Sequence, residues 1–168
     1  PSRCSPFMIP QMISNIASGL IAIRYNLQGP NFCVVSACAT AAHSIGTAQR
    51  MIERGDSDVM LAGGAEGAIC ELGVAGFANM KALSTRNDEP QRASRPWDRD
   101  RDGFVMADGS AIMVVEEYER AKARGAEIYC EVAGFGATCD AFHMTAPMDS
   151  GYGAARAMRD SIKDAGMN

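Results

Sequence analysis

Apolar residues recur at helical spacing in some segments of the chain and form short uninterrupted runs in others. Helical spacing predicts helices over residues 10–25, 39–54, 71–80, 118–124 and 153–165, the last with Asp149 or Ser150 as its cap. Apolar runs predict strands over residues 32–35, 58–62, 110–117 and 128–138. Strand, long helix and strand follow one another between residues 32 and 62. This order is typical of a βαβ unit, so the pattern favours an α/β fold with a parallel sheet.

A polar, charged segment, residues 84–103, interrupts this pattern. Long loops inside compact domains are often functional, and we expect this one to be ordered. Its Trp97, the only tryptophan of the chain, is expected to anchor the loop by packing on the body of the protein. Residues 98–103 imitate the start of a calcium loop, but Gly109 stands where that loop needs a glutamate. We therefore expect a charged loop whose Arg and Asp side chains pair with each other.

Composition and charge narrow the possible functions. The net charge of −4 disfavours a general nucleic-acid surface, and no apolar run is long enough to span a membrane. The six cysteines include no C-x-x-C pair, which removes the main support for a zinc site. We expect reduced thiols, a cytoplasmic location, no metal and no cofactor. The sequence starts at Pro1 and stops just past a predicted helix, so we expect a piece of a longer protein.

Cys38 is the candidate nucleophile. An apolar run ends in small residues just before it and a helical pattern begins just after it, which predicts a thiol at a strand-to-helix turn. Unpaired backbone N–H groups and the positive end of a helix dipole favour a thiolate at such a position. A thiolate is the form that attacks thioesters. A small buried core cysteine is the alternative that this segment leaves open.

The two histidines form no evident pair with this cysteine. His43 follows Cys38 by five residues, a helical spacing that rotates the two side chains apart. We therefore expect His43 to be packed or solvated rather than a catalytic base. His143 lies in the polar segment 140–147, where an ordinary loop position and a pocket-lining role both stay open.

Four stretches of the chain together resemble a known enzyme family. They are SACAT (36–40), AGGAE (62–66), ALSTRN (82–87) running into SRPWD (94–98), and DAFHMT (140–145). In this order they resemble the 3-oxoacyl-[acyl-carrier-protein] synthases, the condensing enzymes of the thiolase superfamily, and most of all those of type II. The resemblance covers essentially the whole chain.

The resemblance implies a fold, a domain organisation and a reaction. The fold would be a partial, layered α-β-α-β-α thiolase-like fold, with a mixed, mostly parallel sheet and helices on both faces. Residues 1–125 would belong to the N-terminal half and residues 126–168 would begin the C-terminal half. Cys38 would hold an acyl chain as a thioester, and the carbanion left when malonyl-carrier protein loses carbon dioxide would attack it. The implied partners are acyl carrier protein and a second copy of the chain, with no nucleic acid and no membrane.

The resemblance also implies roles for individual residues. The backbone N–H of Cys38 would help hold the thioester oxygen. Thr145 matches a position that contacts the pantetheine arm, and His143 is a further substrate-binding candidate in the same segment. The positions that match the lining of the acyl pocket are Met8, Ala37, Gly73 and Phe77. Two further residues, Arg3 and Lys81, match basic positions that face the acidic carrier protein, with plain solvated charge as the alternative for both.

Two catalytic histidines of the family have no counterpart here, because His43 and His143 do not occupy their motifs. We therefore expect that this segment alone does not carry out the condensation. A ketosynthase domain of a polyketide or polyunsaturated fatty acid synthase shares the cysteine turn and stays an alternative, as does a non-catalytic module that binds carrier protein. A partner subunit that sets chain length would usually lack Cys38, and a thiolase fits the segments around Trp97 and His143 less well.

Overall fold

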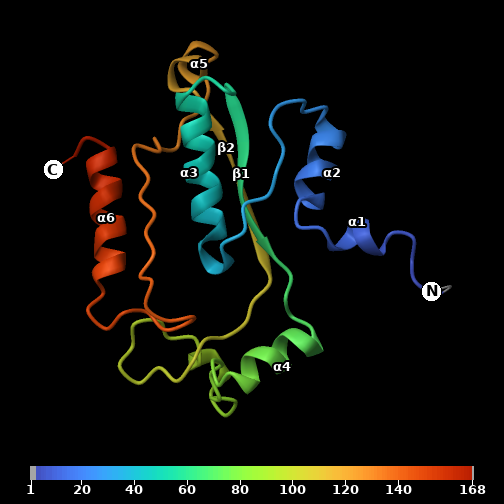
Figure 1. Ribbon diagram of the computed structural model, residues 1–168, viewed down its shortest axis with the longest axis vertical. Coiled ribbons are helices and arrows are strands. Elements are labelled where there is room, and N and C mark those ends of the chain that lie inside the picture. Colours follow the sequence, from blue (N-terminus) through green and yellow to red (C-terminus); the bar gives the residue numbers. More distant parts are fainter. Residues whose placement is uncertain (1–2, 168) are drawn as a thin grey trace. The chain divides into compact units, whose positions relative to one another are not determined.

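The computed structural model describes residues 3–167 and divides into two compact units. Unit 1 comprises residues 1–63 and 112–168, and unit 2 comprises residues 64–111. The helices and strands, in chain order, are α1 (Met8–Met12), α2 (Ile16–Tyr25), α3 (Thr40–Glu53), β1 (Val59–Glu66), α4 (Glu71–Asn79), β2 (Gly109–Glu116), α5 (Tyr118–Ala123) and α6 (Tyr152–Asp164) (Figure 1). Short 3-10 turns, η1 and η2, cover Ala37–Ala39 and Pro90–Arg92.

Helix α3 is the predicted helix over residues 39–54 and is confirmed within one residue at each end. Its buried residues include Gly46, which has no side chain, and Ala48, which has a small one, and both allow close packing. The helix ends where Gly55 adopts a left-handed φ of +77°, and the N–H of Asp56 donates to the carbonyl of Met51. This is the C-terminal geometry that a glycine at that position favours.

Strands β1 and β2 confirm the predicted strands over residues 58–62 and 110–117, and they pair in a two-stranded sheet. The N–H of Glu117, just after β2, donates to the carbonyl of Asp58, just before β1. The end of one strand therefore lies beside the start of the other, and the pair runs antiparallel. The predicted parallel neighbour over residues 32–35 is not a strand, so that βαβ unit is not formed within the described residues.

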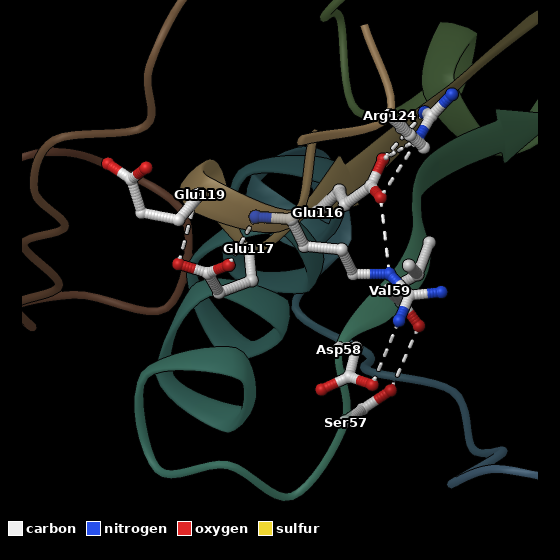
Figure 2. Close-up of polar contacts among 8 residues, drawn as sticks. Ser57, Asp58, Val59, Glu116, Glu117, Glu119 and Arg124 are labelled. Carbon is white, nitrogen blue, oxygen red and sulfur yellow. Dashed lines mark hydrogen bonds and ion pairs between the residues drawn. The ribbon is translucent and has the colours of Figure 1, made fainter. Parts of the chain in front are cut away.

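A charged cluster fixes the turn between β2 and α5 in unit 1. The carboxylate of Glu116, whose side chain is 8% exposed, pairs with Arg124 at 2.7 Å (Figure 2). It also pairs with Arg120 at 3.3 Å. These contacts, the hydrogen bond from Arg124 above all, hold the pKa of Glu116 below its ordinary value. The next residue, Glu117, caps α5 by accepting the N–H groups of Glu119 and Arg120. Opposite charges and a cap at one strand end explain why α5 starts there.

Two predicted strands are wrong, over residues 32–35 and 128–138. Both segments are apolar, but neither has a hydrogen-bonded strand beside it in the described part of the chain. Residues 128–138 instead run between α3 and α6 (Figure 1). A Cβ at Gly134 or Gly136 would overlap backbone atoms of α6, so the segment packs through its bare backbone against a helix. An apolar run does not identify the element that the segment packs against.

The helix predicted over residues 10–25 is two helices. The chain leaves helical geometry at Ile13, where ψ is 134°, and α2 begins after Asn15. Helices α4, α5 and α6 confirm the other predictions within two residues. The predicted cap of α6 is wrong, because its N-cap is Gly151 at a φ of +63°. Ser150 still accepts the N–H of Tyr152 at 3.3 Å.

The loop over residues 84–103, in unit 2, is held by Asp102. Its carboxylate accepts hydrogen bonds from the Ser84 hydroxyl at 2.7 Å and the Thr85 N–H at 2.9 Å. These bonds, with the Ser84 hydroxyl contributing most, lower the pKa of Asp102. The prediction that Trp97 anchors the loop is wrong, because its side chain is 92% exposed. The loop is closed by polar bonds to a carboxylate rather than by an aromatic contact.

The core that the described residues form by themselves is small. Its buried apolar residues are alanines: Ala48, Ala62, Ala93 and Ala121. Large apolar side chains in both units stay exposed, such as Ile23 at 80% and Leu72 at 83%. The apolar fraction of the sequence therefore does not translate into a large core within this chain, because helices α1 and α2 bury none of their residues.

Candidate active site

Cys38 lies on an elbow, here defined as Ser36, Ala37 and Cys38, that leads into α3. Ala37 has a left-handed φ of +49°, an uncommon conformation for a residue with a Cβ. Cys38 follows in the 3-10 turn Ala37–Ala39 and is exposed. Within the described residues Cys38 is therefore not buried, and the thiol stands at the N-terminal end of a 14-residue helix.

Three hydrogen bonds fasten Ser36, the first residue of the elbow. Its N–H donates to the hydroxyl of Thr40 at 2.8 Å, and its carbonyl accepts the N–H of Ala39 at 3.1 Å. Its own hydroxyl lies 2.7 Å from Nδ1 of His43. A strained backbone persists only where the surroundings determine it. The three hydrogen bonds fix Ser36, the residue that directly precedes Ala37.

The backbone N–H of Cys38 is available to a ligand. No carbonyl oxygen among residues 3–167 accepts it, whereas the N–H groups of Ser36, Ala39 and Thr40 are all engaged. An N–H next to a nucleophile can hold the oxyanion that forms when the nucleophile attacks a carbonyl. The elbow therefore presents both an exposed thiol and a candidate oxyanion donor from one residue.

A cavity of about 1020 Å³ opens in unit 1 beside the start of α3. Its walls are the first residues of α3, the segment over residues 135–147 and the first two turns of α6. His143 and Thr145 line it, together with Ala39 and His43, while neither Cys38 nor Met8 does. The structure therefore brings the two predicted residues of the 140–147 segment together in one cavity. Ala39, which also lines this cavity, directly follows Cys38 in the sequence.

The ring of His143 organises its own loop. Its Nδ1 accepts the N–H groups of Thr145 at 3.1 Å and Ala146 at 3.0 Å. A nitrogen that accepts cannot carry a proton, so this arrangement requires the tautomer protonated on Nε2. His143 is thereby left with one N–H that can donate to a polar ligand in the cavity.

Asp140 closes the same loop. Its carboxylate accepts the N–H of Met148 at 2.9 Å, which ties the two ends of the loop together. The other carboxylate oxygen lies against Gly153 in the first turn of α6, where a Cβ would overlap it. Sequence reasoning missed this residue, although it opens the DAFHMT segment. The loop that carries His143 and Thr145 is therefore fixed to α6 through a carboxylate and a glycine.

His43, for which the sequence leaves a packed and a solvated position open, is packed and half-buried. Its ring meets Phe135 edge to face, with centroids 5.9 Å apart. Its hydrogen bond to Ser36 joins residues seven apart across a turn and a helix start. No sequence periodicity reports such a contact, so the sequence indicates His43 but not its partner.

The other predicted site residues are not part of the lining of the cavity beside α3. Gly73 and Phe77 belong to α4 in unit 2, where Phe77 meets Phe104 edge to face at 5.2 Å. A Cβ at Gly73 would overlap the carbonyl oxygen of Ala68, which gives this glycine a local packing role. Lys81 follows the same helix at a φ of +55° and is exposed.

Two predicted residues lie near the start of unit 1. Met8 is the first residue of α1 and is 46% exposed. Arg3 is exposed. Within residues 3–167 no group of three or more His, Cys, Asp or Glu side chains is placed to hold a metal ion. No helix in the described part of the chain has the length and apolar character that crossing a membrane requires.

Comparison with known sequences identifies similar proteins. Residues 1–121 match the family described as beta-ketoacyl synthase, N-terminal domain. The chain is 58% identical over 167 residues to 3-oxoacyl-[acyl-carrier-protein] synthase 2 of Vibrio cholerae serotype O1, covering 99% of the chain and 40% of that protein. It is 54% identical over 166 residues to the mitochondrial 3-oxoacyl-[acyl-carrier-protein] synthase of Arabidopsis thaliana, covering 98% of the chain and 36% of that protein. The chain thus spans well under half the length of these relatives.

Solved structures give the same picture of the fold. One similar structure is a type II polyketide ketosynthase in complex with its acyl-carrier protein. The match covers all of this chain and 41% of the ketosynthase chain, with a TM-score of 0.96 at 34% identity. A beta-ketoacyl synthase from Burkholderia phymatum matches 97% of the chain and 39% of its own with a TM-score of 0.90 at 42% identity. These matches confirm the expected thiolase-like α/β class.

Proposed function

The chain belongs to the beta-ketoacyl synthase family, and on this premise we propose that it carries the nucleophile of a 3-oxoacyl-[acyl-carrier-protein] synthase of fatty acid elongation. The observation that carries the proposal is the elbow: an exposed Cys38 directly after a left-handed Ala37, at the start of α3. Strained backbone at a nucleophile is a feature of sites that hold a reactive group in a fixed direction.

In the first step, the Cys38 thiolate attacks the carbonyl carbon of an acyl thioester on carrier protein. A C–S bond to Cys38 forms, the C–S bond to the pantetheine sulfur breaks, and the carrier leaves as a thiolate that takes up a proton. The negative charge on the carbonyl oxygen during this exchange is held by the Cys38 N–H. A donor aimed at such an oxygen lowers the activation free energy of the step by roughly 3 kcal/mol.

In the second step, malonyl-carrier protein loses carbon dioxide, and the electron pair of the broken C–C bond stays on the adjacent carbon. That carbon attacks the Cys38 thioester, a C–C bond forms, and the C–S bond to Cys38 breaks to return the thiolate. The product is a 3-oxoacyl chain two carbons longer on the carrier. We assign no residue of this chain to the decarboxylation, because His43 is engaged by Ser36 and His143 by its own loop.

The cavity beside α3 suits the arm of the carrier in this proposal. Its loop offers the Thr145 side chain and one N–H of His143 to the amide groups of pantetheine. Acyl-chain contacts are assigned to Met8, Ala37, Gly73 and Phe77, by their match to pocket positions of the family. Small side chains at 37 and 73 leave room for a chain.

The proposed partners are an acidic acyl carrier protein and a second copy of the chain. Arg3 and Lys81, both exposed, are the proposed basic contacts of the carrier. The Burkholderia and polyketide structures each belong to longer chains than this one, so the pairing of two copies is a proposal for the whole protein. We further propose the cytoplasm as its location, in keeping with six cysteines that are all free thiols.

The proposed division into halves at residues 125 and 126 is supported by the family match, which ends at residue 121. The alternative of a polyketide ketosynthase has support in the fold match at 34% identity. The higher identity, 58%, to a protein named for 3-oxoacyl-[acyl-carrier-protein] synthesis favours the fatty acid reaction.

The test is a condensation assay on the protein as its gene encodes it, with acyl- and malonyl-carrier protein. We expect a 3-oxoacyl product and carbon dioxide in equal amounts, and loss of the 3-oxoacyl product in Cys38→Ala. The matched control is Cys33→Ser, which removes another exposed thiol and should retain activity. Equal activity of Cys38→Ala and the unaltered protein would refute the proposal and leave a binding module as the alternative.

A further inference from the structure

The hydrogen bonds to Ser36 define a structural unit behind the nucleophile, which we call the elbow clamp: Ser36, Thr40 and His43. The hydroxyl of Thr40 and Nδ1 of His43 hold Ser36 at distances of 2.8 and 2.7 Å, on its N–H and on its side chain. Both partners come from α3, so the clamp ties the residue before the strained Ala37 to a rigid helix. All three residues are partly buried, which limits competition from water.

We infer that His43 is a positioning residue, which acts on Cys38 through Ser36 without touching substrate. This inference rests on the proposed function of Cys38. By fixing Ser36, the clamp fixes the φ of Ala37, and with it the direction of both the Cys38 thiol and the Cys38 N–H. Rates fall about 100-fold when a reacting group is misplaced by about 1 Å, so a modest loosening here is expected to matter.

The orientation of His43 is itself determined on two sides. Its ring edge packs on Phe135, and Phe135 lies over Gly46 one turn further along α3. The N–H of Phe135 in turn donates to Asp164 in α6 at 2.9 Å. His43 therefore cannot swing away from Ser36 without moving an aromatic ring that is itself fixed to a helix.

Two substitutions at position 43 separate the ring from the hydrogen bond. His43→Phe keeps an aromatic ring against Phe135 and removes the nitrogen, whereas His43→Asn keeps a polar atom near the position of Nδ1 and removes the ring. The matched control is Ser44→Ala in the same helix turn, because Ser44 accepts the N–H of Gly63 at 3.3 Å and takes no part in the hydrogen bonds of the elbow clamp.

The readout is the rate at which Cys38 is acylated by acyl-carrier protein, compared with its rate of alkylation by iodoacetamide. Acylation needs the oxyanion donor and alkylation does not. Cys130, also exposed, serves as the reference thiol in the same sample. We expect His43→Phe to slow acylation about tenfold, while alkylation of Cys38 relative to Cys130 stays within about threefold. We expect His43→Asn to recover at least half of the lost acylation rate on a logarithmic scale. Ser44→Ala should be acylated at the rate of the unaltered protein.

A rate of acylation in His43→Phe within twofold of the unaltered protein would overturn the inference, as would an Asn variant no faster than the Phe variant. If the unaltered protein takes no acyl group at Cys38, the proposed function fails instead. The clamp is then tested by the equilibrium constant of folding in a double-mutant cycle of Ser36→Ala and His43→Phe. The equilibrium constant of folding should fall about fivefold in the double variant, which is no more than in either single variant. Independent, multiplicative losses would contradict the clamp.

Discussion

The ring of Phe135 lies directly over Gly46 in α3, so close that a Cβ at position 46 would overlap three of its ring atoms. Gly46 is buried, and the contact joins α3 to a segment without secondary structure that also packs on α6. The absence of a side chain at one helical position thus determines how near the 135–147 segment, and the cavity it lines, can lie to the elbow.

Gly46→Ala is expected to destabilise the protein by about 1–3 kcal/mol, because the ring of Phe135 must move. The matched control is Gly19→Ala in α2, where a Cβ meets nothing within 4 Å. That change should stabilise by about 0.5–1 kcal/mol, as alanine does in an unobstructed helix. Urea unfolding of both variants measures the difference, and equal effects of the two substitutions would contradict the packing described here.

Gly153→Ala tests the loop over residues 140–148. A Cβ at 153 would overlap the carboxylate of Asp140, so the substitution should expel that carboxylate and free the N–H of Met148. We expect faster amide hydrogen exchange at Met148 and in the loop, with exchange in α3 unchanged. Asp140→Asn is the companion variant, because it keeps one acceptor for Met148 and should produce a smaller change. Protection at Met148 that survives in Gly153→Ala would show that Asp140 is not what closes the loop.

The ion pair between Arg50 of α3 and Asp164 of α6 gives an acid-dependent stability. The hydrogen bond from Arg50, and then the N–H of Phe135, hold the pKa of Asp164 below its ordinary value of 3.8. A carboxyl whose pKa is lower in the folded state stabilises that state above its unfolded pKa, and the stabilisation is lost as pH falls through the folded pKa. Asp164→Asn should therefore have a lower Tm at pH 7, with a gap that closes below pH 3.8.

The control for this pH series is Asp56→Asn, which breaks the exposed pair between Asp56 and Arg54. Exposed pairs contribute little, so its Tm should follow that of the unaltered protein at every pH. A gap for Asp164→Asn that stays constant from pH 7 to pH 2.5, a range chosen to span about one unit below an ordinary aspartate pKa, would refute the assignment.

Lys81 allows the charge and the backbone at one position to be tested separately. It follows α4 with a φ of +55°, and the N–H of Ala82 donates to Phe77, a helix end that glycine favours. Lys81→Gly should raise stability by up to about 1 kcal/mol while removing the charge. Lys81→Glu should weaken carrier binding about fivefold and Lys81→Arg should not, as expected for a rim charge. Carrier affinity that is equal in the Glu and Arg variants would leave Lys81 as plain solvated charge.

Sequence patterns predicted those parts of the fold in which a residue's neighbours lie close in the chain. Helix α3 and strands β1 and β2 follow from local periodicity and from stops such as Gly55. The strand predicted over residues 128–138 is absent because this segment packs on α6, through Gly134 and Gly136. No local pattern distinguishes a helix partner from a strand partner.

The candidate site divides in the same way. Cys38 could be found from the small residues before it and the helical pattern after it, although the strand predicted over residues 32–35 is absent, and the structure adds that Ala37 is strained. The clamp from His43 to Ser36 could not be found, since it joins a turn to a helix face. Trp97 was misjudged because a lone aromatic in a polar loop resembles an anchor, whereas Asp102 performs that role.

The most direct test of the account is to incubate the protein with acyl-carrier protein alone, without malonyl-carrier protein, and map the acyl group by mass spectrometry. All six cysteines are exposed, so accessibility gives none of them an advantage. The account predicts one acyl group per chain, on Cys38, released by hydroxylamine and absent from Cys38→Ala. Acyl groups spread over several cysteines, or on none, would contradict the claim that the elbow makes Cys38 the nucleophile.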